Sequence, residues 1–214
     1  MFKGKRLSIL GDSVSTYKGI SNDQSAHPTL WNNPWFYCGE FLPEKTYWMR
    51  LIKELGFELC VNNSWSGGNL SGQEDLNAGV NRVSYLARGD GSVPDFIIVF
   101  MGLNDLGRNV NVDTFATDYE KTLEKIKELY PEATTCCVNL PDRDAYFRSR
   151  TELFNGAIVK AVKNAGDSFF VADLFNSRLN NDFYYMNTVD GLHPDEDGMK
   201  IIAEVIKKAI ITRK

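Results

Sequence analysis

The sequence lacks the features of membrane-spanning and nucleic-acid-binding proteins. No apolar run approaches the roughly 20 residues that a transmembrane helix needs. The 24 Lys and Arg residues are outnumbered by 28 Asp and Glu residues, which leaves a formal net charge of −4. Because nucleic acids and anionic membranes attract basic surfaces, this charge argues against both as partners. The amino terminus has an apolar stretch too short for a secretory signal, so we expect a cytoplasmic protein.

Metal-binding patterns are also missing. The four cysteines, Cys38, Cys60, Cys136 and Cys137, form no C-x-x-C pair and no Cys/His cluster at zinc spacing. We therefore expect buried, reduced thiols, no metal site and no cofactor. Cys136 and Cys137 are adjacent in an expected strand, so their side chains should point to opposite faces of a sheet.

What the chain does contain is a regular alternation of two patterns. Apolar, β-rich segments lie at 6–10, 58–62, 95–101, 134–140 and 168–174. Apolar residues recur at helical period within 48–55, 80–86, 115–126, 151–164 and 195–211. This alternation predicts an α/β fold, a three-layer α/β/α sandwich around a five-stranded parallel sheet. Because repeats, low-complexity tracts and flexible linkers are lacking, we expect residues 1–214 to form a single domain.

Four polar segments follow or flank the predicted strands, and parallel sheets bind ligands beyond the carboxyl ends of their strands. These segments read GDS at 11–13, NNSWSGGN at 62–69, FMGLNDLG at 100–107 and DGLHPD at 190–195. Each segment taken alone is a common turn or helix cap. Together they contain every group that acyl transfer requires.

The first requirement is a nucleophile with a base. A serine hydroxyl attacks an ester carbonyl only when a base removes its proton. The chain has two histidines, and His193 has Asp190 three residues before it. If these residues form a turn, the Asp190 carboxylate can bind Nδ1 of His193 and leave Nε2 free to face Ser13.

The second requirement is a set of hydrogen-bond donors for the oxyanion. The backbone N–H of Ser13, the backbone N–H of Gly67 and the side-chain amide of Asn104 would supply three donors. Asp12 is expected to brace the nucleophile turn through backbone hydrogen bonds. Asp105 is expected to act as a helix cap or a loop brace.

These four blocks, in this order, resemble those of the SGNH hydrolase, or GDSL esterase/lipase, superfamily. The blocks are Gly11-Asp12-Ser13, the segment around Gly67, Gly102-x-Asn104-Asp105 and Asp190-x-x-His193. The resemblance implies a flavodoxin-like sheet with strand order 2-1-3-4-5, a Ser13–His193–Asp190 triad, and an oxyanion hole of Ser13, Gly67 and Asn104. Valine replaces the family's leucine at position 14, which leaves this chemistry unchanged. The chain has no G-x-S-x-G elbow, which argues against an α/β-hydrolase.

A long segment, 18–45, follows the nucleophile block and is rich in aromatic residues. A segment of this length without a clear period is usually functional, such as a lid or a binding loop. We expect Trp35 in this segment and Trp65, two residues before Gly67, to bind substrate, because an indole offers a flat apolar face and a hydrogen-bonding edge. Packing in the core is the alternative for these aromatic residues, and His27 has no assigned role.

The function expected from these observations is hydrolysis of short O-acyl esters, most simply acetyl esters, of a carbohydrate or another small polar alcohol. A lipase-like or thioesterase-like acyl hydrolase is a close alternative. A flavodoxin-like module that binds phosphate or glycans without catalysis is the alternative from a different class, but it leaves Asp190 and His193 unexplained. The expected partner is a small-molecule ester, and the sequence does not specify an oligomeric state.

Overall fold

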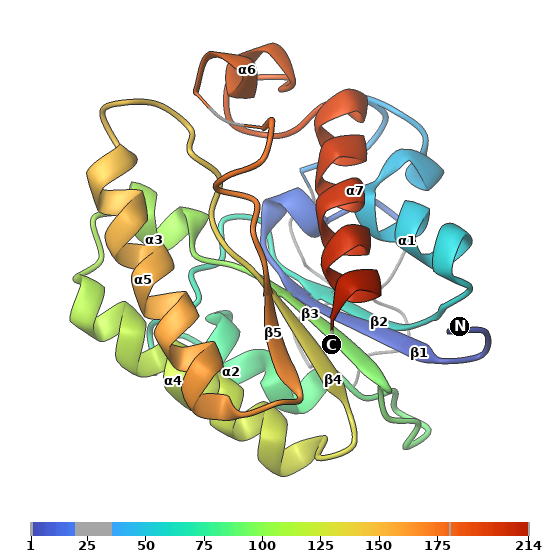
Figure 1. The fold of residues 1–214 in the computed structure, drawn as a ribbon. Helices are drawn as coiled ribbons and strands as arrows, with labels where there is room; N and C mark the ends of the chain where they lie inside the picture. Colours follow the sequence, from blue (N-terminus) through green and yellow to red (C-terminus); the bar gives the residue numbers. More distant parts are fainter. Residues whose placement is uncertain (1, 20–35, 180, 214) are drawn as a thin grey trace.

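The structure, a computed structural model, describes residues 2–19, 36–179 and 181–213. In these residues five parallel strands form one sheet (Figure 1). The strands are β1 (Arg6–Gly11), β2 (Glu58–Ser64), β3 (Phe96–Phe100), β4 (Thr134–Val138) and β5 (Phe169–Ala172). Their order across the sheet is β2-β1-β3-β4-β5, which is the order implied by the family resemblance.

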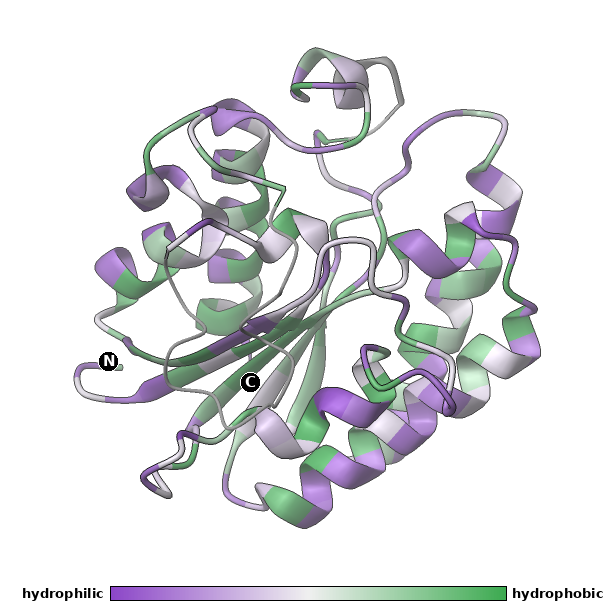
Figure 2. Ribbon diagram, turned by 180° about the vertical axis from the view of Figure 1, so that it is seen from behind, coloured by the Kyte–Doolittle hydropathy of each residue, from purple (hydrophilic) through white to green (hydrophobic). Residues whose placement is uncertain are grey.

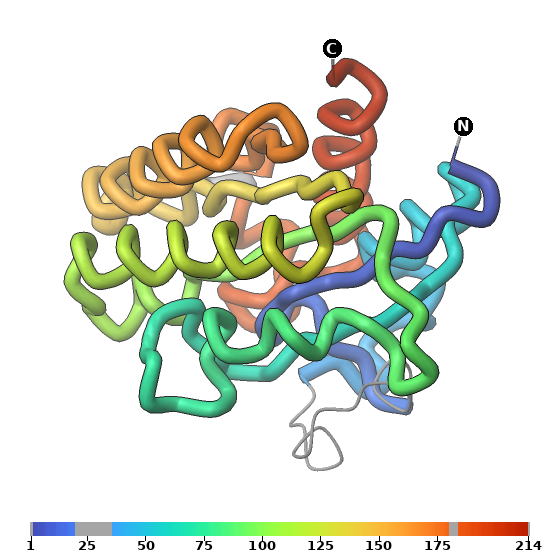
Figure 3. Tube along the Cα trace, turned by 90° about the horizontal axis from the view of Figure 1, so that it is seen from below, coloured from blue at the N-terminus to red at the C-terminus, as the bar shows by residue number. Residues whose placement is uncertain are grey.

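Helices cover both faces of the sheet, as Figure 1 shows. One face carries α1 (Tyr47–Leu55) and α7 (Glu196–Thr212). The other carries α2 (Gly79–Arg82), α4 (Val112–Leu129) and α5 (Arg148–Ala165), and α4 and α5 run side by side (Figure 3). The three-layer α/β/α architecture predicted from the sequence is therefore confirmed.

Each face of the sheet has its own apolar core. Ile9 and Ile98 pack in the core beneath α1 and α7, whereas Ile97 packs in the core beneath α4 and α5. Cys136 belongs to the first core and Cys137 to the second, so the two adjacent thiols do point to opposite faces. In Figure 2 the strands inside are largely hydrophobic, whereas the helices outside carry both hydrophobic and hydrophilic residues.

The expectation of buried thiols is wrong at one position. Cys60, Cys136 and Cys137 are buried, but Cys38 is exposed. Its backbone N–H donates to the Glu40 carboxylate at 2.8 Å on the surface. This turn directs the thiol outward.

The main helices begin and end at residues that satisfy their backbone groups. The Thr46 hydroxyl accepts from the Met49 N–H at the start of α1, and Gly56 ends α1 in the left-handed region, with φ of 81°. The Asp195 carboxylate accepts from the Gly198 N–H at the start of α7. This cap matters for function because α7 begins three residues after His193.

Three segments differ from the expectation. The apolar stripe at 80–86 is not one helix but α2 followed by a 3₁₀ turn, Val83–Tyr85. Its apolar residues are three apart, and that spacing also matches a 3₁₀ turn. Two short helices, α3 (Leu103–Gly107) and α6 (Asn181–Met186), were not predicted because helices of this length show no clear period.

The described residues include no helix of the length and apolarity that a membrane span requires. The two ends of the described chain lie on the same side of the molecule in Figure 3. Of the aromatic segment 18–45, residues 20–35 lie outside the described residues, and a 3₁₀ turn forms at Pro43–Lys45.

Candidate active site

Ser13 is placed by the sharp turn that ends β1. It is the first residue of a 3₁₀ turn, Ser13–Ser15, that begins two residues after the strand. The Asp12 carboxylate accepts from the Val14 N–H at 3.0 Å, and the Thr16 hydroxyl donates to the Ser13 carbonyl at 2.8 Å. The expected brace by Asp12 is therefore present, and it fixes the serine at the carboxyl edge of the sheet.

The structure brings Ser13, His193 and Asp190 into one hydrogen-bonded chain. Nε2 of His193 lies 2.9 Å from Oγ of Ser13, although the residues are 180 positions apart. Nδ1 of His193 lies 2.8 Å from Oδ2 of Asp190. A serine hydroxyl, an imidazole and a carboxylate in this order form the proton relay of a serine hydrolase.

The Asp190 carboxylate also shapes the turn that carries the histidine. Its Oδ1 accepts from the backbone N–H groups of Leu192 and His193, at 3.0 and 2.7 Å. Partial burial raises the pKa of Asp190, whereas the two backbone hydrogen bonds and the hydrogen bond to the imidazole lower it. Together the hydrogen bonds have the larger effect, so the pKa lies below its ordinary value. The carboxylate is therefore held in the ionised form that orients an imidazole.

The histidine turn is anchored to the core from several sides. The hydroxyl of buried Tyr184 donates to the Leu192 carbonyl at 2.6 Å, and that of buried Tyr37 donates to the Pro194 carbonyl at 2.7 Å. Gly198 packs so closely on this segment that a Cβ there would overlap the Asn187 carbonyl oxygen. The position of His193 thus depends on the start of α7 as well as on its own turn.

An aromatic side chain that the motifs do not include covers the imidazole. The Phe36 ring stacks on His193 with centroids 3.4 Å apart and planes 13° apart. Its backbone N–H donates to Thr16 Oγ1 at 2.9 Å, and Tyr37 meets the imidazole edge-on at 6.3 Å. Of the aromatic residues in the segment 18–45, Phe36 therefore touches the predicted base, whereas Tyr37 is a core residue.

The predicted oxyanion donors lie at adjacent strand ends. Gly67 has a φ of 74°, a left-handed conformation that favours glycine. Within the described part of the chain, no backbone acceptor binds the N–H of Ser13 or Gly67. The Asn104 side-chain amide donates to the Gly68 carbonyl at 3.0 Å and makes a longer contact, 3.4 Å, with Oδ2 of Asp12.

A buried arginine beneath the nucleophile turn was not anticipated. Arg82 is fully buried, and its guanidinium donates to the carbonyls of Gly11 and Asn63, at 2.9 and 2.6 Å. It thereby joins the ends of β1 and β2. Burial lowers the pKa of Arg82 to about 10, although the negative charges of Asp12 and Asp75 raise it. The sequence indicated this role only weakly, because Arg82 is a single charged residue within the apolar stripe at 80–86.

Asp12 has a strongly shifted acidity. Its side chain is 1 % exposed, and burial raises its pKa to about 7, against the opposing effects of the Val14 N–H and the Arg82 charge. Ser13 therefore follows a carboxyl group that titrates near neutral pH.

Asp105 is the loop brace that the sequence suggested. Its buried carboxylate accepts from the backbone N–H groups of Leu70 and Ser71, at 2.7 and 3.0 Å, and from the Ser71 hydroxyl. Burial raises the pKa of Asp105, although the Ser71 and Leu70 hydrogen bonds lower it. The brace holds the segment that follows Gly67.

The remaining predicted residues lie in two places. Trp65 is half-buried, and its backbone N–H donates to the Gly11 carbonyl at 3.2 Å, beside the nucleophile turn. Trp35 and His27 lie outside the described residues. Among the described residues, no group of three His, Cys, Asp or Glu side chains is arranged to hold a metal ion.

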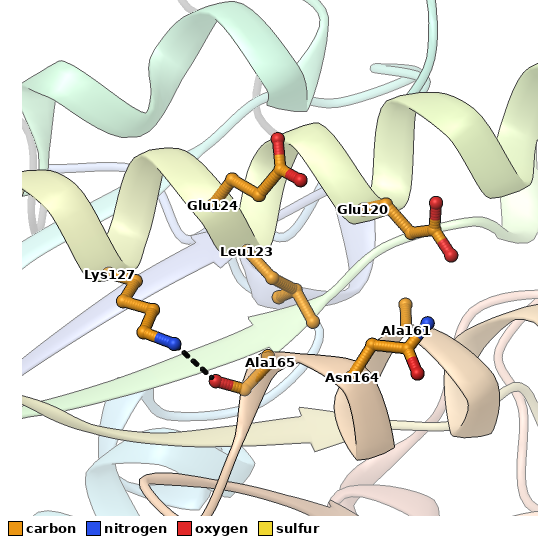
Figure 4. A pocket seen from close by; sticks show the side chains of 7 residues that line it. All are labelled: Glu120, Leu123, Glu124, Lys127, Ala161, Asn164 and Ala165. Atoms are coloured by element: carbon orange, nitrogen blue, oxygen red, sulfur yellow. Dashed lines mark hydrogen bonds between the residues drawn. The ribbon is translucent and has the colours of Figure 1, made fainter.

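A separate hollow lies between α4 and α5 and is drawn in Figure 4. Lys127 on α4 donates there to the Ala165 carbonyl at 3.0 Å. None of the predicted site residues lines this hollow. The candidate active site is therefore the carboxyl edge of the sheet, where the relay forms.

Comparison with known proteins agrees with this geometry. The model of the GDSL-like lipase/acylhydrolase family matches residues 5–210. No curated protein sequence matches the chain.

Solved structures resemble the chain over almost its whole length. A GDSL-like lipase from Bacteroides ovatus has 23% sequence identity and a TM-score of 0.75, and the match covers 98% of this chain and 99% of that one. A family 3 carbohydrate esterase from Clostridium thermocellum has 18% identity and a TM-score of 0.64, with 98% and 96% covered. A family 2 carbohydrate esterase with a carbohydrate-binding domain, from Corynascus thermopiles, has 20% identity and a TM-score of 0.67, with 98% and 66% covered.

At these identities the solved structures establish the fold, and the family match extends over nearly the entire chain. The chain therefore belongs to the GDSL-like lipase/acylhydrolase family, within the SGNH hydrolase superfamily, and is an ester hydrolase of that family.

Proposed function

We propose that the chain hydrolyses acetyl esters of a carbohydrate or another small polar alcohol, with Ser13 as nucleophile. The observation that carries this proposal is the continuous relay from Ser13 Oγ to His193 Nε2 and from His193 Nδ1 to Asp190, with both distances below 3 Å. The imidazole takes the proton of the attacking hydroxyl and later delivers it to the departing alcohol. Asp190 keeps the imidazole in the correct tautomer and stabilises its charged form.

The oxyanion of the tetrahedral intermediate would be bound by Ser13 N–H, Gly67 N–H and Asn104. The two backbone donors have no competing backbone acceptor within the described residues. Asn104 already donates to Gly68, so the hydrogen that points along its longer, 3.4 Å contact to Asp12 is the one available to the oxyanion. Water then hydrolyses the acyl-enzyme by the same relay in reverse.

Two observations support a small acyl group on a polar alcohol. Some of the similar solved structures are carbohydrate esterases. The Phe36 ring lies directly on the imidazole, and a bulky group there leaves little room around the relay. Trp35 and Trp65 are proposed to bind the alcohol through their indole faces.

The proposal is tested by an acyl-chain series on one alcohol. Acetyl esters should be hydrolysed faster than butyryl and longer esters, and Ser13→Ala should abolish turnover of all of them. A preference for octanoyl esters would favour the lipase-like alternative. Retention of glycan or phosphate binding without any esterase activity would favour the non-catalytic module.

A second measurement tests the aromatic side chains. Trp65→Ala and Trp35→Ala should lower kcat/KM on an acetylated sugar more than on p-nitrophenyl acetate, because the aryl ester makes little use of an alcohol-binding wall. Equal losses on both substrates would show that these residues act through packing.

We further propose that residues 1–214 act as one hydrolase domain in the cytoplasm. The single sheet and the free cysteines are consistent with this proposal. Fractionation of the native host with an antibody to the chain would test the location.

A further inference from the structure

The loop that carries Gly67 is held by three side chains from one short segment. Asn104 donates to the Gly68 carbonyl, and Asp105 accepts from the two N–H groups that follow this loop. Arg108, the residue after α3, donates from one guanidinium nitrogen to the Gly67 carbonyl and to Oδ1 of Asn69, each at 2.6 Å.

Arg108 differs from the other two in its exposure. The Asp105 side chain is completely buried and Asn104 is half-buried, whereas Arg108 is exposed. Its second terminal nitrogen, Nη2, lies 3.4 Å from the position that a Cβ on Gly67 would occupy. A cationic group therefore lies directly against the glycine of the predicted oxyanion hole and remains accessible to solvent.

Two N–H donors on one edge of the Arg108 guanidinium make no hydrogen bond within the described residues. Both hydrogen bonds of Arg108 come from Nη1, so Nε and Nη2 have no acceptor among the described residues. Nε–H and Nη2–H are parallel and form the fork that binds a carboxylate or a phosphate with two hydrogen bonds.

Nothing in the described chain neutralises this charge. The acceptors of Arg108 are a carbonyl and an amide oxygen, both neutral. No Asp or Glu of the described residues forms an ion pair with it, although Arg148 and Arg178, for example, each have a carboxylate partner. In a chain with a net charge of −4, an unpaired arginine at this place is a candidate for ligand recognition.

We propose that Arg108 binds an anionic group of the substrate, so that the preferred esters carry a carboxylate or a phosphate close to the acyl group. This inference rests on the proposed function, since it concerns the ester that Ser13 attacks. One guanidinium edge holds the Gly67 loop, and the free edge receives the anion. Arg108 thus selects among alcohols by charge, in addition to its contact with the oxyanion loop.

The test compares two acetyl esters of nearly equal shape and different charge. meta-Acetoxybenzoate carries a carboxylate, and meta-acetoxybenzamide carries a neutral amide in its place. At low ionic strength the wild-type chain should hydrolyse the anionic ester with kcat/KM about five- to tenfold higher, the effect of one partly exposed charge-assisted contact. Added salt should reduce this preference through screening. meta-Acetoxyphenyl phosphate, as a third substrate, distinguishes phosphate from carboxylate.

Three variants separate charge recognition from support of the loop. Arg108→Gln should bring the anionic-to-neutral ratio close to one, whatever it does to the absolute rates, and Arg108→Lys should keep part of the preference. Lys163→Gln removes an exposed positive charge from the last turn of α5 and should keep the wild-type ratio.

Each contrary result has a definite meaning. A wild-type ratio near one, or an Arg108→Gln ratio equal to that of the wild type, would show that Arg108 only braces the loop and would overturn the inference. Failure to hydrolyse any acetyl ester would overturn the proposed function itself, and the inference with it.

Discussion

The acidity of Asp12 leads to a prediction about the pH dependence of stability. Asp12 is buried in the folded protein, where burial raises its pKa from 3.8 to about 7. In the unfolded chain the same carboxyl is in water and ionises near pH 4. Between these values the folded state holds a proton that the unfolded state has lost, so the free energy of unfolding falls as the pH rises.

The magnitude follows from the difference between the two pKa values. At about 1.4 kcal/mol per pH unit, the full difference corresponds to about 4 kcal/mol. About 3 kcal/mol of this falls between pH 5 and pH 8, because the folded group titrates inside that window. Above pH 8 both states are ionised and the loss is complete.

Asp12→Asn removes this titration while keeping an oxygen that can accept from the Val14 N–H. Urea unfolding, followed by tryptophan fluorescence, gives the free energy of unfolding of the wild type and the variant at several pH values. The difference, variant minus wild type, should rise by about 3 kcal/mol from pH 5 to pH 8.

Glu74→Gln controls for the loss of one negative charge, because Glu74 is exposed. Parallel stability curves for wild type and Asp12→Asn would refute the reasoning. They would show that the Asp12 carboxyl is already ionised in the folded protein at pH 5.

The other predictions concern the relay, the oxyanion hole and the packing behind them. Ser13→Ala and His193→Ala should each abolish nearly all hydrolysis, and the double variant should lose little more, because the relay acts as a unit; multiplicative losses in steady-state kinetics would contradict the triad. Asn104→Ala should lower kcat by about 10²–10³ with KM much less affected, whereas a raised KM at constant kcat would make Asn104 a substrate-binding residue. Gly198→Ala should cost about 1–3 kcal/mol of stability and also lower kcat, because its Cβ would push the histidine turn away from the serine. Its control is Gly156→Ala on α5, where a Cβ meets nothing within 4 Å and should stabilise the chain by about 0.5–1 kcal/mol; equal effects of the two substitutions would show that the contact of Gly198 is unimportant.

The sequence alone predicted the features that depend on local chemistry. The period of apolar residues distinguishes strands from helices, so the five strands and the main helices were expected near their observed positions. The Asp190–His193 turn is equally local, because a carboxylate three residues before a histidine can reach its backbone and its ring. Even the opposite orientations of Cys136 and Cys137 follow from the alternation of side chains in a strand.

The meeting of Ser13 and His193 was expected only through the family resemblance and the rule that strand ends converge. The distance between them depends on how β1 and the start of α7 pack on one sheet, and no local pattern encodes it. It also depends on the bond from the hydroxyl of Tyr37 to the carbonyl of Pro194, which joins segments 157 positions apart.

Tertiary structure alone decided which polar and aromatic side chains serve the site. The sequence hardly separates buried Arg82 from exposed Arg108, yet one joins two strand ends and the other lies open beside Gly67. Phe36 belongs to an aromatic segment without a period, and only the folded chain places its ring on the imidazole. The physical reason is that burial, pKa and stacking are set by neighbours distant in sequence, whereas strands, helices and turns are set largely by neighbours close in sequence.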